Sequence, residues 1–183
     1  MLVNYRLSSK ELSGVPGEAA WAESMGYDGV SSSETAHDPF LPLVLAATST
    51  SRVTLATSVA IAFPRSPMVT AHTSRDLQDL SQGRFRLGLG TQVKGHIERR
   101  FSTIWEAPGP KLREYVQSLR HIWDCWANGG KLDFQGKYYQ FSLMTPFITR
   151  RNRQGVIIAA DQAVDRNTVL KMATAWGSEY LMK

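Results

Sequence analysis

Three residues able to carry charge or protons stand close together just after a short apolar run. Glu34, His37 and Asp38 follow segment 28–30, Asp-Gly-Val, which is typical of a strand in a buried sheet. Parallel α/β proteins place their chemistry at the carboxyl ends of their strands. A strand needs only backbone pairing and packing, so these side chains have no evident structural task. The sequence therefore places a candidate site after residue 32.

A second candidate for chemistry ends another apolar run. Segment 84–91 closes on Gly88-Leu89-Gly90-Thr91, and His96 follows shortly after. Glycines remove the Cβ atoms that would keep a flat ring or a phosphate away from backbone amides and the Thr91 hydroxyl. The motif lacks the third glycine of a dinucleotide fingerprint, so a simple tight turn remains the alternative. A solvated loop residue is likewise the alternative for His96.

The elements that must position these residues alternate between apolar strand patterns and helical patterns. We expect strands at 2–7, 29–32, 53–62 and 84–90, each followed by a helix. Such alternation predicts a parallel sheet. A helix should begin at Ser66-Pro67 and end before Gly83, and a strongly amphipathic helix should start at Pro110. Segments 132–134 and 138–141 then predict a β-hairpin, with a positive φ at Gly136.

Four strand–helix units predict an α/β fold, the N-terminal half of a (β/α)8 TIM barrel with a small hairpin insertion. A complete barrel needs about 200 to 250 residues. We therefore expect residues 1–147 to form the half barrel and the chain to be truncated after about residue 147. We expect residues 148–183 to form an atypical basic tail with one strand and one helix.

Composition narrows the class of protein. The 183 residues carry a net charge of +5, and no segment is apolar enough for a membrane span or a secretory signal. We expect a cytoplasmic protein that does not bind membranes. The single Cys125 is expected to be buried, and the scattered histidines predict no metal site. The basic tail lacks interleaved aromatic residues, which argues against nucleic-acid binding.

Several segments together resemble the bacterial luciferase-like superfamily in both order and spacing. The similarity covers about residues 1–147 and rests on segments 26–30, 33–43, 55–59, 63–67, 76–85 and 87–91. Within this superfamily the chain is most similar to the branch that uses coenzyme F-420, a 5-deazaflavin, because segment 91–101 also has counterparts there. Use of FMN is the alternative.

The resemblance implies an oxidoreductase or monooxygenase that transfers hydride to or from a coenzyme ring at the barrel mouth. A small organic molecule, whose identity the sequence leaves open, is the expected substrate. By position His37 and Glu34 would shuttle the accompanying proton. Ser58 and Val59 match the place where members carry a bulge or a cis peptide behind the ring. Gly90, Thr91 and His96 would lie beside the ring or its side chain.

The predicted truncation leaves two other outcomes open. An open half barrel would expose the edges and inner faces of its strands, which favours pairing into a homo-oligomer. The chain could also be a non-catalytic remnant that binds no coenzyme. Coenzyme binding distinguishes the remnant from the enzyme.

Overall fold

The computed structural model describes residues 1–8, 11–128 and 131–142. The chain divides into two units, Met1–Phe141 and Ser142–Lys183, and nearly all described residues belong to the first. The predicted boundary after residue 147 lies outside the described residues, as do the strand and helix predicted within 148–183. Both stay predictions.

A parallel sheet organises the first unit. Four strands pair in the order β1-β2-β3-β5, with Val30 of β2 opposite Tyr5 on one side and Leu55 on the other. This confirms the predicted parallel α/β arrangement. The strands are β1 (Asn4–Arg6), β2 (Gly29–Ser32), β3 (Thr54–Thr57), β4 (Ala60–Ile61), β5 (Phe85–Arg86), β6 (Leu89–Gly90), β7 (Asp133–Gln135) and β8 (Gln140–Ser142).

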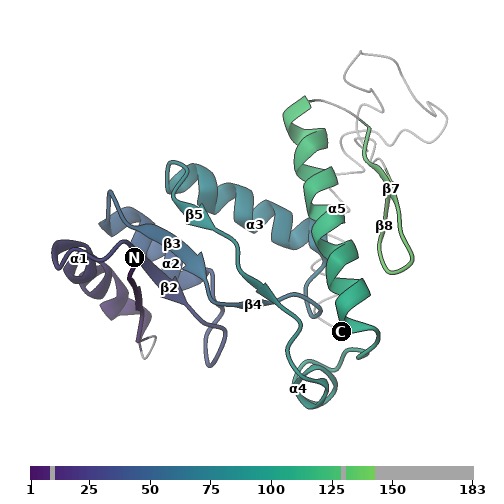
Figure 1. Ribbon diagram of the computed structural model, residues 1–183, viewed down its shortest axis with the longest axis horizontal. Coiled ribbons are helices and arrows are strands. Elements are labelled where there is room, and N and C mark those ends of the chain that lie inside the picture. Colours follow the sequence, from purple (N-terminus) through teal and green to yellow (C-terminus); the bar gives the residue numbers. More distant parts are fainter. Residues whose placement is uncertain (9–10, 129–130, 143–183) are drawn as a thin grey trace, which may run out of the picture. The chain divides into compact units, whose positions relative to one another are not determined.

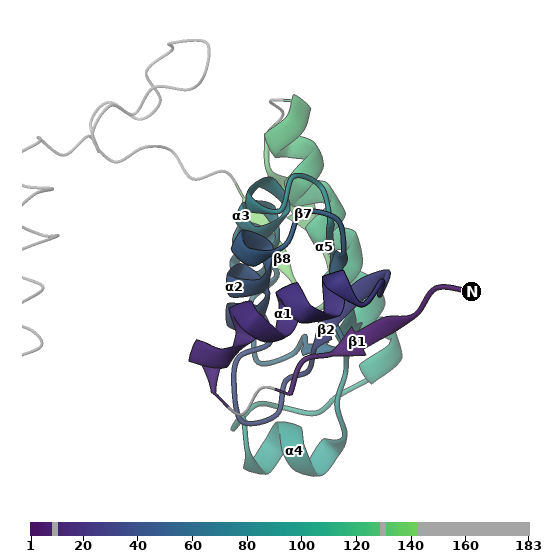
Figure 2. The same ribbon diagram turned by 90° about the vertical axis from the view of Figure 1, so that its left-hand side faces the viewer.

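Helices connect the first parallel strands and also follow the last of them, β6. They are the short 3-10 helix η1 (Leu12–Gly14), α1 (Val15–Ser24), α2 (Leu41–Ser49), α3 (Pro67–Leu80), α4 (Lys94–Arg99) and α5 (Pro108–Asn128). Helices α1, α2, α3 and α5 pack against one another in the order of the sequence (Figure 1). The short α4, which the sequence did not predict, lies apart from that row (Figure 2). None of the described helices is long and apolar enough to cross a membrane.

Helix α3 begins and ends where its sequence predicts. The Ser66 hydroxyl accepts a hydrogen bond from the Met68 amide, and Pro67 occupies the first turn. Gly83 adopts a φ of 86°, a conformation that glycine tolerates best, and returns the chain to the sheet. The predicted core face of α5 is also confirmed, since Tyr115 and Ile122 are buried, and so is the buried Cys125.

Two predicted long strands are each interrupted, so the prediction of continuous strands over 53–62 and 84–90 was wrong. β3 stops at Thr57, and a cis peptide bond joins Ser58 to Val59 before β4 begins. The partner strand breaks at the same level, between β5 and β6. The reason is a close backbone approach: a Cβ on Gly88 would lie 2.1 Å from the Thr57 carbonyl oxygen. Pairing resumes beyond the break, where the Ala60 amide donates to the Gly88 carbonyl at 2.9 Å.

The predicted hairpin is present as β7 and β8, but its turn is built differently from the prediction. Gly136 does not adopt a positive φ. Instead the Glu114 carboxylate of α5 accepts hydrogen bonds from the amides of Lys137, Tyr138 and Tyr139 at 3.0, 2.7 and 2.7 Å. A Cβ on Gly136 would lie 2.1 Å from a Glu114 oxygen. The glycine is thus needed to admit the carboxylate.

A second carboxylate fastens the entry to β3. Glu23 accepts hydrogen bonds from the amides of Ser51, Arg52 and Val53 at 2.7 to 3.1 Å. Partial burial opposes the charge, but these amides outweigh it and lower the pKa of Glu23 from 4.5 to about 2. Because the folded chain holds the charged form more strongly than the unfolded chain does, this contribution to stability is complete above pH 4.5 and is lost as the pH falls toward 2.

Replacing Glu23 with Gln should therefore destabilise the chain in a pH-dependent way. We expect the free energy of unfolding at pH 7 to fall by about 1 to 2 kcal/mol, a value reduced for the partial exposure of the carboxylate. The difference from the wild type should shrink as the pH falls through the window from 4.5 to 2. Urea unfolding at several pH values measures this. Glu98→Gln, at an exposed side chain whose nearest cation is 3.9 Å away, should change stability little. A Glu23→Gln deficit that stays constant with pH would contradict the assignment.

Candidate active site

The carboxyl ends of the parallel strands bring several of the predicted site residues to one edge of the sheet. Ser32 at the end of β2 pairs in register with Thr57 at the end of β3. Beyond these residues the two chains remain joined: the Ser58 amide donates to the Ser32 carbonyl at 2.7 Å, and the Ser33 hydroxyl donates to the Ser58 carbonyl at 2.8 Å. Further along the chain, Ile61 of β4 pairs with Gly90 of β6, which precedes Thr91.

Glu34 takes part in a partly buried ion-pair network. Its side chain is only 6% exposed, and its Oε2 accepts hydrogen bonds from the Arg65 guanidinium and from the Ile61 amide, both at 2.7 Å. The second guanidinium nitrogen of Arg65 donates to Asp38 at 2.8 Å. Burial disfavours the charge of Arg65, but the hydrogen bonds to the two carboxylates raise its pKa above its ordinary value. The geometry makes Glu34 an acceptor for two donors.

The loop that carries His37 is held on both sides of the histidine. Asp38 reaches Arg65 and also accepts a hydrogen bond from the Phe40 amide at 2.8 Å, where α2 begins. On the other side, the Arg100 guanidinium beyond α4 donates to the Thr35 carbonyl. His37 itself is half-buried. The imidazole therefore belongs to a loop that hydrogen bonds fix on both sides, next to the strand ends.

The Ser58–Val59 segment is accessible. Its cis peptide bond agrees with the conformation that the family resemblance implied. Ser58 is exposed, and Val59 is 43% exposed although it stands between two strands. A Cβ on Gly90 would lie 2.6 Å from a Val59 methyl carbon, so Gly90 makes room for the Val59 side chain. We call the exposed Val59 side chain and the adjoining half-buried Gly90 the open apolar surface; Ser58, next to Val59, accepts a hydrogen bond from Ser33, which precedes the His37 loop.

Thr91 and His96, the remaining predicted site residues, have fewer contacts with the strand-end groups. Thr91 is half-buried, and its hydroxyl donates to the carbonyl of Gln92 at 3.1 Å, where Gln92 adopts a φ of 61°. His96 is exposed on α4. Within the described residues, no hydrogen bond joins the His96 ring to the strand-end groups. The structure thus brings Glu34, Ser58 and Gly90 to one edge and leaves His96 on a separate short helix.

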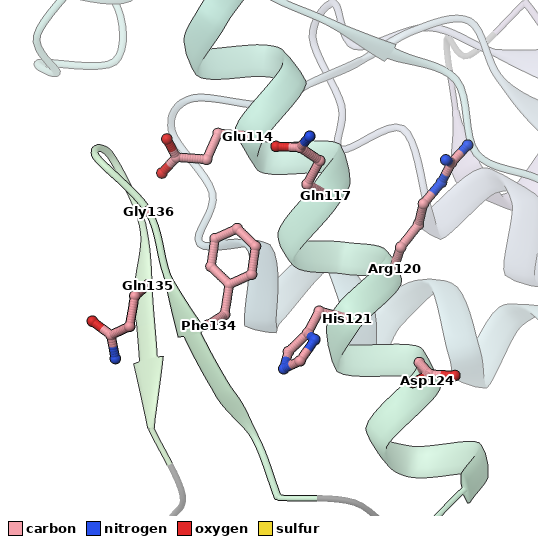
Figure 3. Close-up of a pocket in the computed structure, with 8 residues that line it drawn as sticks. All are labelled: Glu114, Gln117, Arg120, His121, Asp124, Phe134, Gln135 and Gly136. Carbon is pink, nitrogen blue, oxygen red and sulfur yellow. The ribbon is translucent and has the colours of Figure 1, made fainter.

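An open cleft of about 840 Å³ lies elsewhere, between α5 and the hairpin (Figure 3). It contains none of the predicted site residues. The His121 ring in it accepts a weak hydrogen bond from the Asp133 amide at 3.4 Å, and the Glu114 carboxylate is occupied by the hairpin amides. The described residues also contain no group of three side chains that could hold a metal ion. The strand ends remain the better candidate.

Two arginines that organise the site escaped prediction from sequence. Arg65 lies in a strand–helix connection, and Arg100 follows α4 in a charged run, Glu98-Arg99-Arg100, that is typical of a solvated helix end. Arg65 pairs with Glu34 across 31 positions of sequence, a contact that exists only after the sheet forms. The one local hint was a charged residue between Pro64 and Ser66-Pro67, which strand and helix signals leave unexplained.

The sequence is similar to several mycobacterial proteins. An uncharacterised protein of Mycobacterium tuberculosis is 51% identical over 127 residues, which are 69% of this chain and 37% of that protein. A proposed coenzyme F-420-dependent oxidoreductase of the same species is 33% identical over 125 residues, 68% of this chain and 35% of that protein. This chain therefore spans little more than a third of the length of these relatives.

Solved structures share the fold. The oxygenating component of 3,6-diketocamphane monooxygenase from Pseudomonas putida, in complex with FMN, has a TM-score of 0.66 at 18% identity, covering 78% of this chain and 44% of that one. The F-420-dependent tetrahydromethanopterin reductase of Methanopyrus kandleri has a TM-score of 0.63 at 18% identity, covering 77% and 44%. The predicted α/β fold, similar to part of a TIM barrel, is thereby confirmed. The family described as luciferase-like monooxygenase matches residues 4–178, which extends beyond residue 147. This chain therefore belongs to the luciferase-like monooxygenase family.

Proposed function

We propose that this chain binds a flavin-type coenzyme at the carboxyl edge of its sheet and acts in hydride transfer between that coenzyme and a small organic substrate. One observation carries the proposal: the exposed Ser58–Val59 segment and Gly90 lie at the edge where Ser33 and Glu34, which precede His37, are hydrogen-bonded to Ser58 and Ile61. The mycobacterial relative and the solved structures support F-420 or FMN as the coenzyme. We favour F-420, because segment 91–101 resembles the F-420 branch.

The residues present fit a flat ring. The surface of Val59 and Gly90 is apolar and open, which suits stacking of an aromatic face, and Gly90 presents backbone without a side chain. Ser58 and Thr91 flank this surface with hydroxyl groups that could bind the polar edge of a ring or its side chain. Polar groups of this kind, the Thr91 hydroxyl as an acceptor because it donates to Gln92, fix orientation while the apolar contact supplies affinity.

In this proposal each residue has a separate task. The bound coenzyme supplies a ring that accepts or donates hydride. His37 holds or delivers the proton that accompanies the hydride, because an imidazole exchanges protons readily near neutral pH. Glu34, already bound by Arg65 and the Ile61 amide, keeps the loop in place and is a poorer candidate for proton transfer.

A titration of the purified chain with F-420 and, separately, with FMN tests the proposal. We expect saturable binding, followed by ring absorbance or fluorescence, with tighter binding of F-420. His37→Ala should weaken binding about tenfold, the loss expected for one hydrogen bond to a polar ring atom. His121→Ala, in the cleft beside the hairpin, is the matched control and should bind like the wild type.

Two results would contradict the proposal. If a folded sample bound neither ring, the chain would be the non-catalytic remnant. If His121→Ala weakened binding and His37→Ala did not, the coenzyme would occupy the cleft beside α5 instead of the strand ends.

A further inference from the structure

The Arg65 guanidinium binds two carboxylates that lie on either side of His37 in the sequence. Its nitrogens reach Glu34 at 2.7 Å and Asp38 at 2.8 Å, three residues before the histidine and one residue after it. The fork of a guanidinium can meet two carboxylates with a fixed separation, which a single ammonium group cannot do as well. Arg65 therefore fixes the distance between the two ends of the loop that carries His37.

Arg65 also joins this loop to β4, the strand that follows Val59 of the open apolar surface. The same nitrogen that binds Glu34 donates to the Ile61 carbonyl at 2.9 Å, while Glu34 accepts from the Ile61 amide at 2.7 Å. Ile61 lies two residues after Val59 and pairs with Gly90. The network thus connects the His37 loop with both segments that form the open apolar surface.

The surroundings of Arg65 favour a well-fixed group. Its side chain is 18% exposed, and the guanidinium lies 5.8 Å from the centre of the Phe40 ring. A partly buried pair screened from water holds its geometry better than an exposed surface pair does. The Arg75–Asp79 pair on α3, with side chains 49% and 66% exposed, shows the contrasting case.

We propose that Arg65 is a positioning residue of the site, which holds His37 against the coenzyme surface through Glu34 and Asp38. The inference rests on the proposed function for its meaning in catalysis. The position of His37 can nevertheless be tested without coenzyme, so the two claims can fail separately.

The first measurement is an NMR spectrum of the histidine rings in the coenzyme-free chain, with His37 assigned by its loss in His37→Ala. In Arg65→Gln we expect the His37 signal to move toward that of an unstructured peptide, while the signals of His72 and His121 stay in place. Arg65→Lys keeps the charge and should give a smaller displacement. Arg75→Gln is the matched control and should leave the His37 signal unchanged.

The second measurement is a double-mutant cycle on F-420 binding. Arg65→Gln should weaken binding about tenfold in the wild-type background, and less than about twofold when His37 is already Ala, because it acts through that histidine. Arg65→Lys should lie between these values, and it serves if the glutamine variant does not fold. Additive effects together with an unmoved His37 signal would overturn the inference. If the wild type bound no coenzyme, the proposed function would fail, while the NMR result would still decide whether Arg65 places His37.

Discussion

Replacing Gly88 with Ala is expected to lower the free energy of unfolding by about 3 kcal/mol, the upper range for forcing extra volume into a packed site. The new Cβ would lie 2.1 Å from the Thr57 carbonyl oxygen, a backbone atom that cannot rotate away. The Thr57 hydroxyl also donates to the Gly88 carbonyl and accepts from the Gly88 amide, both at 2.8 Å. Separating the two chains would weaken these bonds. Urea unfolding measures the loss.

Gly17→Ala is the matched control for this substitution. Gly17 lies exposed in α1, and a Cβ there would meet no atom within 4 Å. Alanine is favoured over glycine in a helix, so we expect the free energy of unfolding to rise by about 0.5 to 1 kcal/mol. Equal effects at positions 17 and 88 would show that the close approach at Thr57 does not limit the fold.

Gly90→Ala is expected to weaken coenzyme binding at least about tenfold while lowering stability by only about 1 kcal/mol. Its Cβ would lie 2.6 Å from a methyl carbon of Val59. A β-branched side chain has few rotamers, so Val59 would be pushed outward, into the surface where we place the ring. A coenzyme titration and a urea unfolding experiment on the same sample separate the two effects.

A second substitution tests the cause. Val59→Ala removes the methyl groups that Gly90→Ala would displace, so the double variant should bind coenzyme more tightly than Gly90→Ala alone, although it also loses the apolar contact of Val59. Gly95→Ala is the control for a glycine-to-alanine change without a clash. Its Cβ would come no closer than 3.4 Å to the end of the Arg99 side chain, so this variant should bind like the wild type. Failure of the double variant to recover would show that Gly90 contributes in another way.

Local signals in the sequence predicted most of the fold. Apolar runs located the strands, and Ser66-Pro67 with Gly83 located α3, because caps and positive φ angles are local properties. The breaks in the two long strands were missed. They depend on the approach of Gly88 to Thr57 across 31 positions, and the apolar pattern continues through both breaks. Gly136 was assigned the wrong cause for the same reason, since its partner Glu114 is distant in sequence.

The candidate site was predicted in part. Strand ends and glycines identified the edge of the sheet, and the family resemblance implied the conformation at Ser58 and Val59. Sequence alone kept both His37 and Glu34 as candidates for proton transfer and preferred the imidazole. The structure separates them, because Glu34 is bound to Arg65 and the Ile61 amide. A partnership of this kind depends on tertiary contacts, which a single sequence does not reveal.

Hydrogen exchange with and without F-420, followed by mass spectrometry, tests most directly where the coenzyme binds. If the ring lies at the strand ends, peptides covering 58–63 and 88–93 should exchange more slowly in the complex, and the His37 loop should follow. Peptides covering α5 and the hairpin should be unchanged. Protection confined to 117–124 and 133–136, the segments around the open cleft, would contradict the strand-end site.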